Sequence, residues 1–279
     1  MQNLAISQIT TSPLTLIDDL QLCQRLGCPL EIAEKKLSTD RSQAQDQLAM
    51  IQESGVRITS IQPLNLTIFP SASAPDPADA EQRLALLMKS VELFAPFFPE
   101  LALITNTGAD HGNEAKVWDD CTHHYQTLAA HAAELGMRIA LEALGPSLMN
   151  QNSILFTYGQ AQEMAAAVDH PSFGVCLDIY NSWQDANLAE SITSNPQPFI
   201  VQIADWRRPK SLHDRLALGD GRIPLAVILQ AIAKTGYSDD VVLEIFSEGV
   251  ADSLWHDKET VTGAVERSQN YYQGLRAKL

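Results

Sequence analysis

Cysteine is rare in this chain, and its placement gives it no evident metal-binding or disulfide role. The four cysteines are Cys23, Cys28, Cys121 and Cys176, and no two of them form a Cys-x-x-Cys pair. We therefore expect reduced, mostly buried thiols, which are typical of a cytoplasmic protein.

Long apolar segments are also missing. No uninterrupted apolar run reaches the roughly 18 residues that would suggest a membrane span. The first residues, MQNLAISQITTSP, have neither the basic start nor the long apolar core of a signal peptide. These absences predict a soluble, cytoplasmic protein without a membrane partner.

Positive charge is scarce. Lys and Arg total 19 against 34 Asp and Glu, which gives a formal net charge of −15. Affinity for nucleic acid comes largely from neutralising phosphates, so we expect no nucleic-acid partner. A small anionic ligand is not excluded, because it needs only a local basic cluster.

What the sequence does contain is a repeated pattern of helix, glycine and strand. An amphipathic helix ends at a glycine and an apolar strand follows, at Gly27, Gly55, Gly136 and Gly236. Glycine is favoured just past a helix because it accepts the left-handed conformation there. The repeat predicts parallel strands joined by crossover helices. Eight strands are expected, at 3–9, 29–33, 57–63, 101–106, 138–143, 173–179, 198–204 and 241–246.

Eight strands alternating with helices over 279 residues predict a (β/α)8 barrel that forms a single domain, residues 1–279. A doubly wound open sheet is the alternative, but its Gly-x-Gly-x-x-Gly fingerprint between strand and helix is absent. Ser12-Pro13 and Asp76-Pro77 predict helix starts, because proline is favoured at the first helical position.

Polar side chains interrupt four of the apolar strands near their C-terminal ends. The run VVLEIF contains Glu244, IALEAL contains Glu142, GVCLDIY contains Asp178, and IVQIAD contains Gln202. An isolated carboxylate in so apolar a run is costly to desolvate unless something pairs with it. In a barrel the C-terminal strand ends converge on one mouth, where active sites lie.

Three carboxylates and an amide oxygen that converge without matching cations would repel one another. A bound divalent ion removes that repulsion, and ligation by oxygen alone suits Mg²⁺ or Mn²⁺. The alternative for each residue is a helix cap or an ion pair with Arg. For the set on consecutive strands we favour the metal, whereas Asp205 is expected to be a loop or cap residue.

Substrate contacts are expected from the loops at the mouth. Four basic residues follow Gln202 within nine positions, and they are Arg207, Arg208, Lys210 and Arg215. They form either an anion site, with Arg207 as the first choice, or a solvated loop paired with surface acids. His111 and His213 lie in strand–helix loops, where each contacts substrate or is simply solvated.

Two further side chains are candidate substrate contacts. Trp206 follows a predicted strand and either walls the pocket or packs in the core. Glu31, at the end of the second strand, either orients a ligand or substrate hydroxyl or pairs with Lys35.

The segment from GMRIALEAL through LALGDGRIPLAVILQAIAKTGYSDDVVLEIF resembles the xylose isomerase-like TIM barrels. This superfamily contains sugar phosphate isomerases and epimerases and the endonuclease IV type. The resemblance implies a metal held by Glu142, Asp178, the residue at 202 and Glu244. By analogy with ketose epimerases, it also implies that Glu142 and Glu244 move the proton.

Two positions depart from the epimerase pattern. Gln202 stands where a His ligand is usual, and Asn181 stands where a His often binds substrate hydroxyls. Gln in the third ligand place is similar to the 3-dehydroshikimate dehydratases of the same superfamily, which are lyases. Asn181 departs from that pattern too.

The sequence leaves four candidate functions. The first is a metal-dependent isomerase or epimerase that acts on a small ketose or polyol ketone through an enediolate. The second is a lyase, a dehydratase or decarboxylase, acting on a polyhydroxylated keto acid. A repair endonuclease is disfavoured by the negative charge and by the absence of His at the strand ends, and a silent binding barrel by the retained acids. The sequence also leaves open a homo-oligomer.

Overall fold

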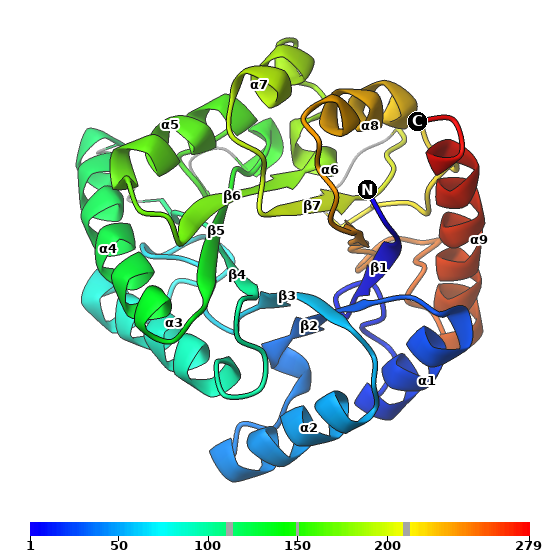
Figure 1. The fold of residues 1–279 in the computed structure, drawn as a ribbon, viewed down its shortest axis with the longest axis horizontal. Coiled ribbons are helices and arrows are strands. Elements are labelled where there is room, and N and C mark those ends of the chain that lie inside the picture. Colours follow the sequence, from blue (N-terminus) through cyan, green and yellow to red (C-terminus); the bar gives the residue numbers. More distant parts are fainter. Residues whose placement is uncertain (110–113, 149–150, 209–212) are drawn as a thin grey trace.

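The computed structural model describes residues 1–109, 114–148, 151–208 and 213–279. Eight parallel strands close into a barrel in which each strand pairs with the next and β8 pairs with β1 (Figure 1). The predicted single-domain (β/α)8 barrel is therefore confirmed, and the open sheet is excluded. The strands are β1 Leu4–Ser7, β2 Leu30–Ala33, β3 Ile58–Gln62, β4 Ala102–Thr105, β5 Arg138–Glu142, β6 Phe173–Asp178, β7 Ile200–Ile203 and β8 Val241–Leu243.

Helices form a ring outside the strands (Figure 1). The α-helices are α1 Leu16–Leu26, α2 Arg41–Glu53, α3 Ala80–Phe94, α4 Glu114–Glu134, α5 Tyr158–Val168, α6 Ile179–Ser182, α7 Leu188–Ser194, α8 Leu225–Lys234 and α9 Lys258–Arg276. Short 3-10 turns lie at Glu34–Lys36 and Pro146–Leu148. The single turn α6, which directly follows β6, was not predicted.

Two helices begin later than their prolines suggested. Helix α1 starts at Leu16, because Thr15 caps it in a reciprocal pair with Asp18. Helix α3 starts at Ala80, after Asp79 accepts a hydrogen bond from the backbone N–H of Gln82. Capping side chains satisfy N–H groups that the first turn leaves free, and here they outweigh the preference of proline for the first turn.

The interior of the barrel is filled by small and medium side chains. This inner cluster consists of Ala5, Ala102, Ile104, Ala140, Cys176, Ile200 and Val242. A second and larger apolar layer lies between the strands and the surrounding helices. Burial on both faces explains why the strands read as nearly continuous apolar runs, and why a polar residue in one of them is informative.

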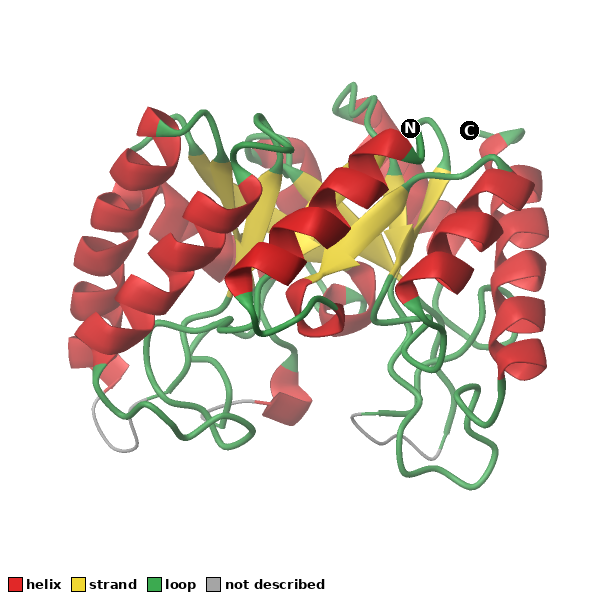
Figure 2. Ribbon diagram, turned by 90° about the horizontal axis from the view of Figure 1, so that it is seen from below, coloured by secondary structure: helices red, strands yellow, loops and turns green. Residues whose placement is uncertain are grey.

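The two ends of the barrel differ. Figure 2 shows the long loops gathered at one end and both chain termini at the other. The long loops follow the C-terminal ends of the strands, so they frame the mouth where the predicted site residues lie. Within the described part of the chain, no helix combines the length and the apolar character needed to cross a membrane.

Candidate active site in the mouth of the barrel

The four predicted ligand residues lie at the same end of the barrel. Glu142 and Asp178 are the last residues of β5 and β6, and Gln202 lies opposite Asp178 on β7. Glu244 follows β8 directly, and its backbone N–H bonds to the carbonyl oxygen of Ile203. All four side chains are buried. The expectation that these strand ends converge is thus met, although convergence alone does not identify a metal ligand.

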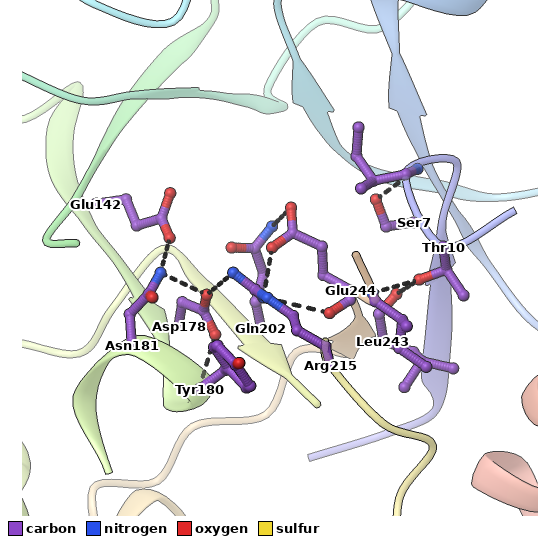
Figure 3. Close-up of polar contacts among 12 residues, drawn as sticks. Ser7, Thr10, Glu142, Asp178, Tyr180, Asn181, Gln202, Arg215, Leu243 and Glu244 are labelled. Carbon is purple, nitrogen blue, oxygen red and sulfur yellow. Dashed lines mark hydrogen bonds and ion pairs between the residues drawn. The ribbon is translucent and has the colours of Figure 1, made fainter. Parts of the chain in front are cut away.

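A guanidinium group lies among these side chains. Arg215 Nη2 is 2.9 Å from Asp178 Oδ2, and Arg215 Nη1 is 2.9 Å from Glu244 Oε2 (Figure 3). The side chain of Arg215 is only 5% exposed, so little water screens these ion pairs. Arg215 is therefore the direct counter-charge of two of the three predicted acidic ligands.

The loop between β7 and α8 fixes the backbone of Arg215. Its N–H donates to the carbonyl oxygen of Phe246 at 2.9 Å, and the next residue, Leu216, forms an antiparallel bridge with Asp205. The guanidinium carbon lies 4.4 Å from the ring centre of Tyr180 and 5.0 Å from that of Phe246. Cation–π contacts with these rings hold the charged group in place.

Asn181 connects Glu142 with Asp178. Its side-chain nitrogen donates to Glu142 Oε1 at 2.9 Å and to Asp178 Oδ2 at 2.8 Å (Figure 3). This contact needs a close approach between α6 and the segment after β5. A Cβ added at Gly145 would lie 2.5 Å from the carbonyl oxygen of Asn181, so only glycine fits there.

Gln202 is oriented by two acceptors at its amide nitrogen and one donor at its amide oxygen. Its nitrogen lies 3.2 Å from Glu244 Oε1 and 3.3 Å from Glu31 Oε1, while its oxygen accepts from Cys176 Sγ at 3.3 Å. The two carboxylates favour this orientation of the amide. Glu31 also accepts a hydrogen bond from Ser60 at 2.6 Å, so it belongs to the buried support of Gln202.

Burial alters the acidity of this cluster. Loss of hydration, followed by the nearby charge of Asp178, raises the pKa of Glu142 to about 8. Burial likewise raises the pKa of Glu244, although Arg215 opposes the shift. For Arg215 burial disfavours the charge, but Asp178 and Glu244 outweigh it and raise its pKa. Carboxyl groups with raised pKa values can hold or release a proton near neutral pH.

The site opens into a cavity of about 280 Å³. That volume lies near the lower end of the roughly 300–1,000 Å³ that is usual for small-molecule pockets. Polar groups in its wall are Gln62, Asn65, Thr67, Ser71, Ser73, Arg83, Asn106, Glu142, Asn152, Asn181, His213, Arg215 and Glu244. Apolar side chains line the rest of the cavity, among them Leu64, Leu66, Leu144, Leu148 and Phe246.

One wall of the cavity is the loop between β3 and α3, and Arg83 anchors it. The buried guanidinium of Arg83 donates to the carbonyl oxygens of Thr67, Ala74, Asp76 and Pro77, at 3.0–3.2 Å. It also donates to the hydroxyl oxygen of Thr67. The anchor holds the loop over the mouth through main-chain atoms.

Arg207 and Trp206, two predicted substrate contacts, are not in the cavity wall. Arg207 pairs with Asp214 and with Asp252, and it lies at the surface. Trp206 is buried and packs against Trp183, with ring centres 5.0 Å apart. Arg207 thus forms a surface ion pair and Trp206 packs in the interior, which are the alternatives that the sequence offered for these residues.

The remaining predicted contacts divide three ways. Asn181 lines the cavity, whereas Glu31 is fully buried behind Gln202. His111 lies outside the described residues. His213, which the sequence left open, does line the cavity, with its ring 5.9 Å from that of Phe246. Its Nδ1 is buried and has no hydrogen-bond partner among the described residues.

The donor set can be compared with the needs of a divalent ion. Three carboxylates and one amide on four consecutive strands are the hard oxygen ligands that Mg²⁺ or Mn²⁺ requires. In the described part of the chain, however, no three acidic, His or Cys side chains stand ready to hold a metal. Arg215 provides a stand-in cation for Asp178 and Glu244. The residues thus fit an ion by their chemistry, once Arg215 leaves the carboxylates and the Gln202 amide turns its oxygen away from Cys176.

The fold and the acids at its mouth define a xylose isomerase-like TIM barrel. The model of that family matches residues 20–271, and the chain belongs to it. Among curated proteins, the chain is 29% identical over 205 residues to a 3-dehydroshikimate dehydratase from Pseudomonas putida. That match covers 68% of this chain but only 28% of the dehydratase. A ketose 3-epimerase from Arthrobacter globiformis is 25% identical over 217 residues, with 70% of each chain covered.

Solved structures support the same fold. The protein SMc04130 from Sinorhizobium meliloti has a TM-score of 0.82 and 22% identity, with 98% of each chain covered. The IolI protein, solved with a bound zinc atom, has a TM-score of 0.76 and 20% identity, with 99% of each chain covered. At these identities the likeness concerns the fold.

Proposed function

We propose that the chain is an isomerase or epimerase that moves a proton at a carbon next to the carbonyl group of a small ketose or polyol ketone. Glu142 and Glu244 carry this proposal, because both line one cavity while standing on strands that are not neighbours. Raised pKa values let one carboxyl act as acid while the other acts as base. The similarity to a ketose 3-epimerase supports this reaction class.

The intermediate of such a reaction is an enediolate. Removal of a proton from the carbon beside the carbonyl places negative charge on oxygen, and nearby N–H donors stabilise it. Arg215 lines the cavity wall, and its Nε–H, which has no partner among the described residues, is such a donor. Return of the proton on the other face of that carbon gives an epimer, whereas return on the neighbouring carbon gives an isomer.

The proposal includes one divalent ion, Mg²⁺ or Mn²⁺. Glu142, Asp178, Gln202 and Glu244 would hold it, and it would supply Lewis-acid polarisation of a carbonyl oxygen. The chemistry of the donor set supports this assignment, and so does the zinc atom in the IolI structure. The protein is expected to act on its substrate in the cytoplasm, without a nucleic acid or a membrane.

A dehydratase is the second candidate. Gln202 in the third ligand place and the similarity to the Pseudomonas putida dehydratase favour it. An enediolate can expel a β-hydroxyl group instead of taking a proton back on carbon. The cavity would then accept a polyhydroxylated keto acid, with Arg215 as the buried cation nearest to its carboxylate.

Proton exchange in deuterated water tests the proposal. Keto sugars and keto acids are incubated with the protein and Mn²⁺ or Mg²⁺, and products are followed by NMR and mass spectrometry. An epimerase incorporates deuterium at one carbon and forms a stereoisomer of equal composition, whereas a dehydratase forms a product that has lost water. Glu142→Gln and Glu244→Gln should abolish exchange. Glu266→Gln, which alters only a surface pair with Arg25, should retain it. Absence of exchange with every substrate would refute both candidates.

A further inference from the structure

We propose that Arg215 is a built-in cation that competes with the divalent ion for Asp178 and Glu244. The protein then has two states, one closed by the guanidinium and one holding the ion. This inference rests on the proposed function, because it takes the same carboxylates as metal ligands. It adds a role for Arg215 that precedes any contact with substrate.

Every carboxylate oxygen of the three acids already accepts an N–H hydrogen bond. Glu142 receives Asn181 and Asn106, at 2.9 and 3.1 Å. The two oxygens of Asp178 receive the backbone N–H of Tyr180 on one side, and Asn181 together with Arg215 on the other. An oxygen that accepts a single hydrogen bond keeps a second lone pair, so the neutral donors leave room for an ion and the charged guanidinium is its main competitor.

Both carboxylate oxygens of Glu244 also accept hydrogen bonds. Its Oε1 accepts from Gln62 at 2.7 Å and from Gln202 at 3.2 Å, and its Oε2 accepts from Arg215 at 2.9 Å. Among the described donors to Asp178 and Glu244, Arg215 alone carries a full charge and bonds to both carboxylates. Its departure therefore frees Glu244 Oε2 and leaves Asn181 as the one described donor to Asp178 Oδ2.

Charge makes the two cations exclusive. Arg215 is buried together with the acids, so a divalent ion beside the guanidinium would meet strong repulsion in a medium that screens poorly. The same burial makes both acids costly to leave unpaired. Asp178 and Glu244 together carry a charge of −2, so a divalent ion neutralises this pair without Arg215 and takes its place.

The side chain of Arg215 can move into the cavity. It lines the cavity, and its Nε has no hydrogen-bond partner among the described residues. Its backbone is held by the carbonyl oxygen of Phe246, so rotation about the side-chain bonds suffices. The exchange needs no movement of a strand or helix.

Metal binding without substrate tests the competition. Chelator-treated wild-type protein, Arg215→Met and Arg207→Met are titrated with Mn²⁺ by calorimetry. Arg207→Met is the matched control, because it removes the same charge from a surface pair. We expect Arg215→Met to bind Mn²⁺ about ten-fold tighter or more, since the competing cation is gone. Arg207→Met should match the wild type.

Thermal unfolding supplies a second readout. Chelator-treated Arg215→Met should melt below the wild type, and Mn²⁺ should raise its Tm more than it raises that of the wild type. An affinity in Arg215→Met equal to or weaker than that of the wild type would overturn the proposal. So would failure of Arg215→Met to bind Mn²⁺ at all.

Crystal structures of the wild type keep the proposal testable if Arg215→Met does not fold. Metal-free crystals should show Arg215 on Asp178 and Glu244, and Mn²⁺-soaked crystals should show it released from both. An ion bound to these carboxylates with Arg215 still paired to them would refute competition. None of these measurements involves turnover, so they fail or succeed independently of the assigned reaction.

Discussion

The side-chain nitrogen of Asn181 lies 2.9 Å from Glu142 Oε1 and donates a hydrogen bond to it, while also binding Asp178. Asn181→Asp would replace this donor with a third carboxylate facing two others. We expect the free energy of unfolding to fall by about 2–3 kcal/mol, because a buried hydrogen bond is lost and like charges meet. Urea denaturation measures the effect.

Asn187→Asp is the matched control for that change. Asn187 is exposed at the start of α7 and makes no side-chain capping bond. Its replacement should leave stability unchanged or slightly higher. Equal losses in the two variants would show that the network around Asn181 has no special role.

Stability should fall as pH rises toward the pKa of Glu142. That pKa is about 8 in the folded protein against an ordinary 4.5, so between these values the folded state keeps a proton that the unfolded state has lost. Its contribution is complete below the ordinary value and is lost as pH rises through the folded value. Glu142→Gln should flatten this dependence in metal-free protein, measured as the free energy of unfolding at several pH values. An unchanged slope would contradict the raised pKa.

Lys36 should be important for stability although it lies outside the cavity wall. Its amino group is 2.7 Å from Asp19 Oδ2, and the side chains of Lys36 and Asp19 are 9% and 0% exposed. Lys36→Met leaves Asp19 buried without its counter-ion, so we expect a loss of about 3–5 kcal/mol. Lys258→Met breaks a largely exposed pair with Asp18 and should cost far less, because water screens that pair. Similar losses in both variants would count against this reasoning.

Gly221 should not tolerate a side chain. The carboxylate of Asp205 accepts backbone N–H groups from Trp206, Gly219, Gly221 and Ile223. A Cβ at Gly221 would overlap Asp205 and lie 2.5 Å from the carbonyl oxygen of Trp206. We expect Gly221→Ala to lower the Tm by several degrees and to disturb the loop that carries Arg215.

Gly274→Ala provides the comparison. Gly274 lies in α9 with open space around its Cα, and alanine favours helix by about 1 kcal/mol over glycine. If Gly274→Ala is more stable than the wild type and Gly221→Ala is less stable, the overlap with Asp205 is the cause of the loss of stability at position 221. Two neutral substitutions would show that the loop adapts.

The barrel and the convergence of Glu142, Asp178, Gln202 and Glu244 could be predicted because both depend on local pattern. Strands buried on both faces are almost purely apolar, so a polar residue near a strand end is conspicuous, and the barrel brings those ends together. Strand ends were less predictable. Residues 241–246 were expected to form one strand, and Ile245 and Phe246 are apolar, yet β8 ends at Leu243.

The sequence led us to expect an anion contact from Arg207, whereas the structure places Arg215 in the cavity wall. Contacts between distant segments explain the difference. Arg207 stands nearest to the strand end, but Asp252 from a distant loop pairs with it at the surface. Arg215 faces inward because Leu216 bridges to Asp205 and its own N–H bonds to Phe246. These partners are set by tertiary structure, and no sequence spacing records them.

Arg83 holds the loop between β3 and α3 through main-chain oxygens, so these contacts do not depend on the side chains of the residues that supply them. Arg83 grips the carbonyl oxygens of Ala74, Asp76 and Pro77, and every amino acid supplies a carbonyl oxygen. Side chains of that loop that make no such contact are therefore open to exchange while the loop stays over the mouth, whereas Ser71 accepts the backbone N–H of Ala74 and Ser73 accepts from Asn152. Substitutions in such a loop can change ligand preference among homologous barrels at little cost to folding. The loop is therefore the natural segment to randomise when new substrates are sought.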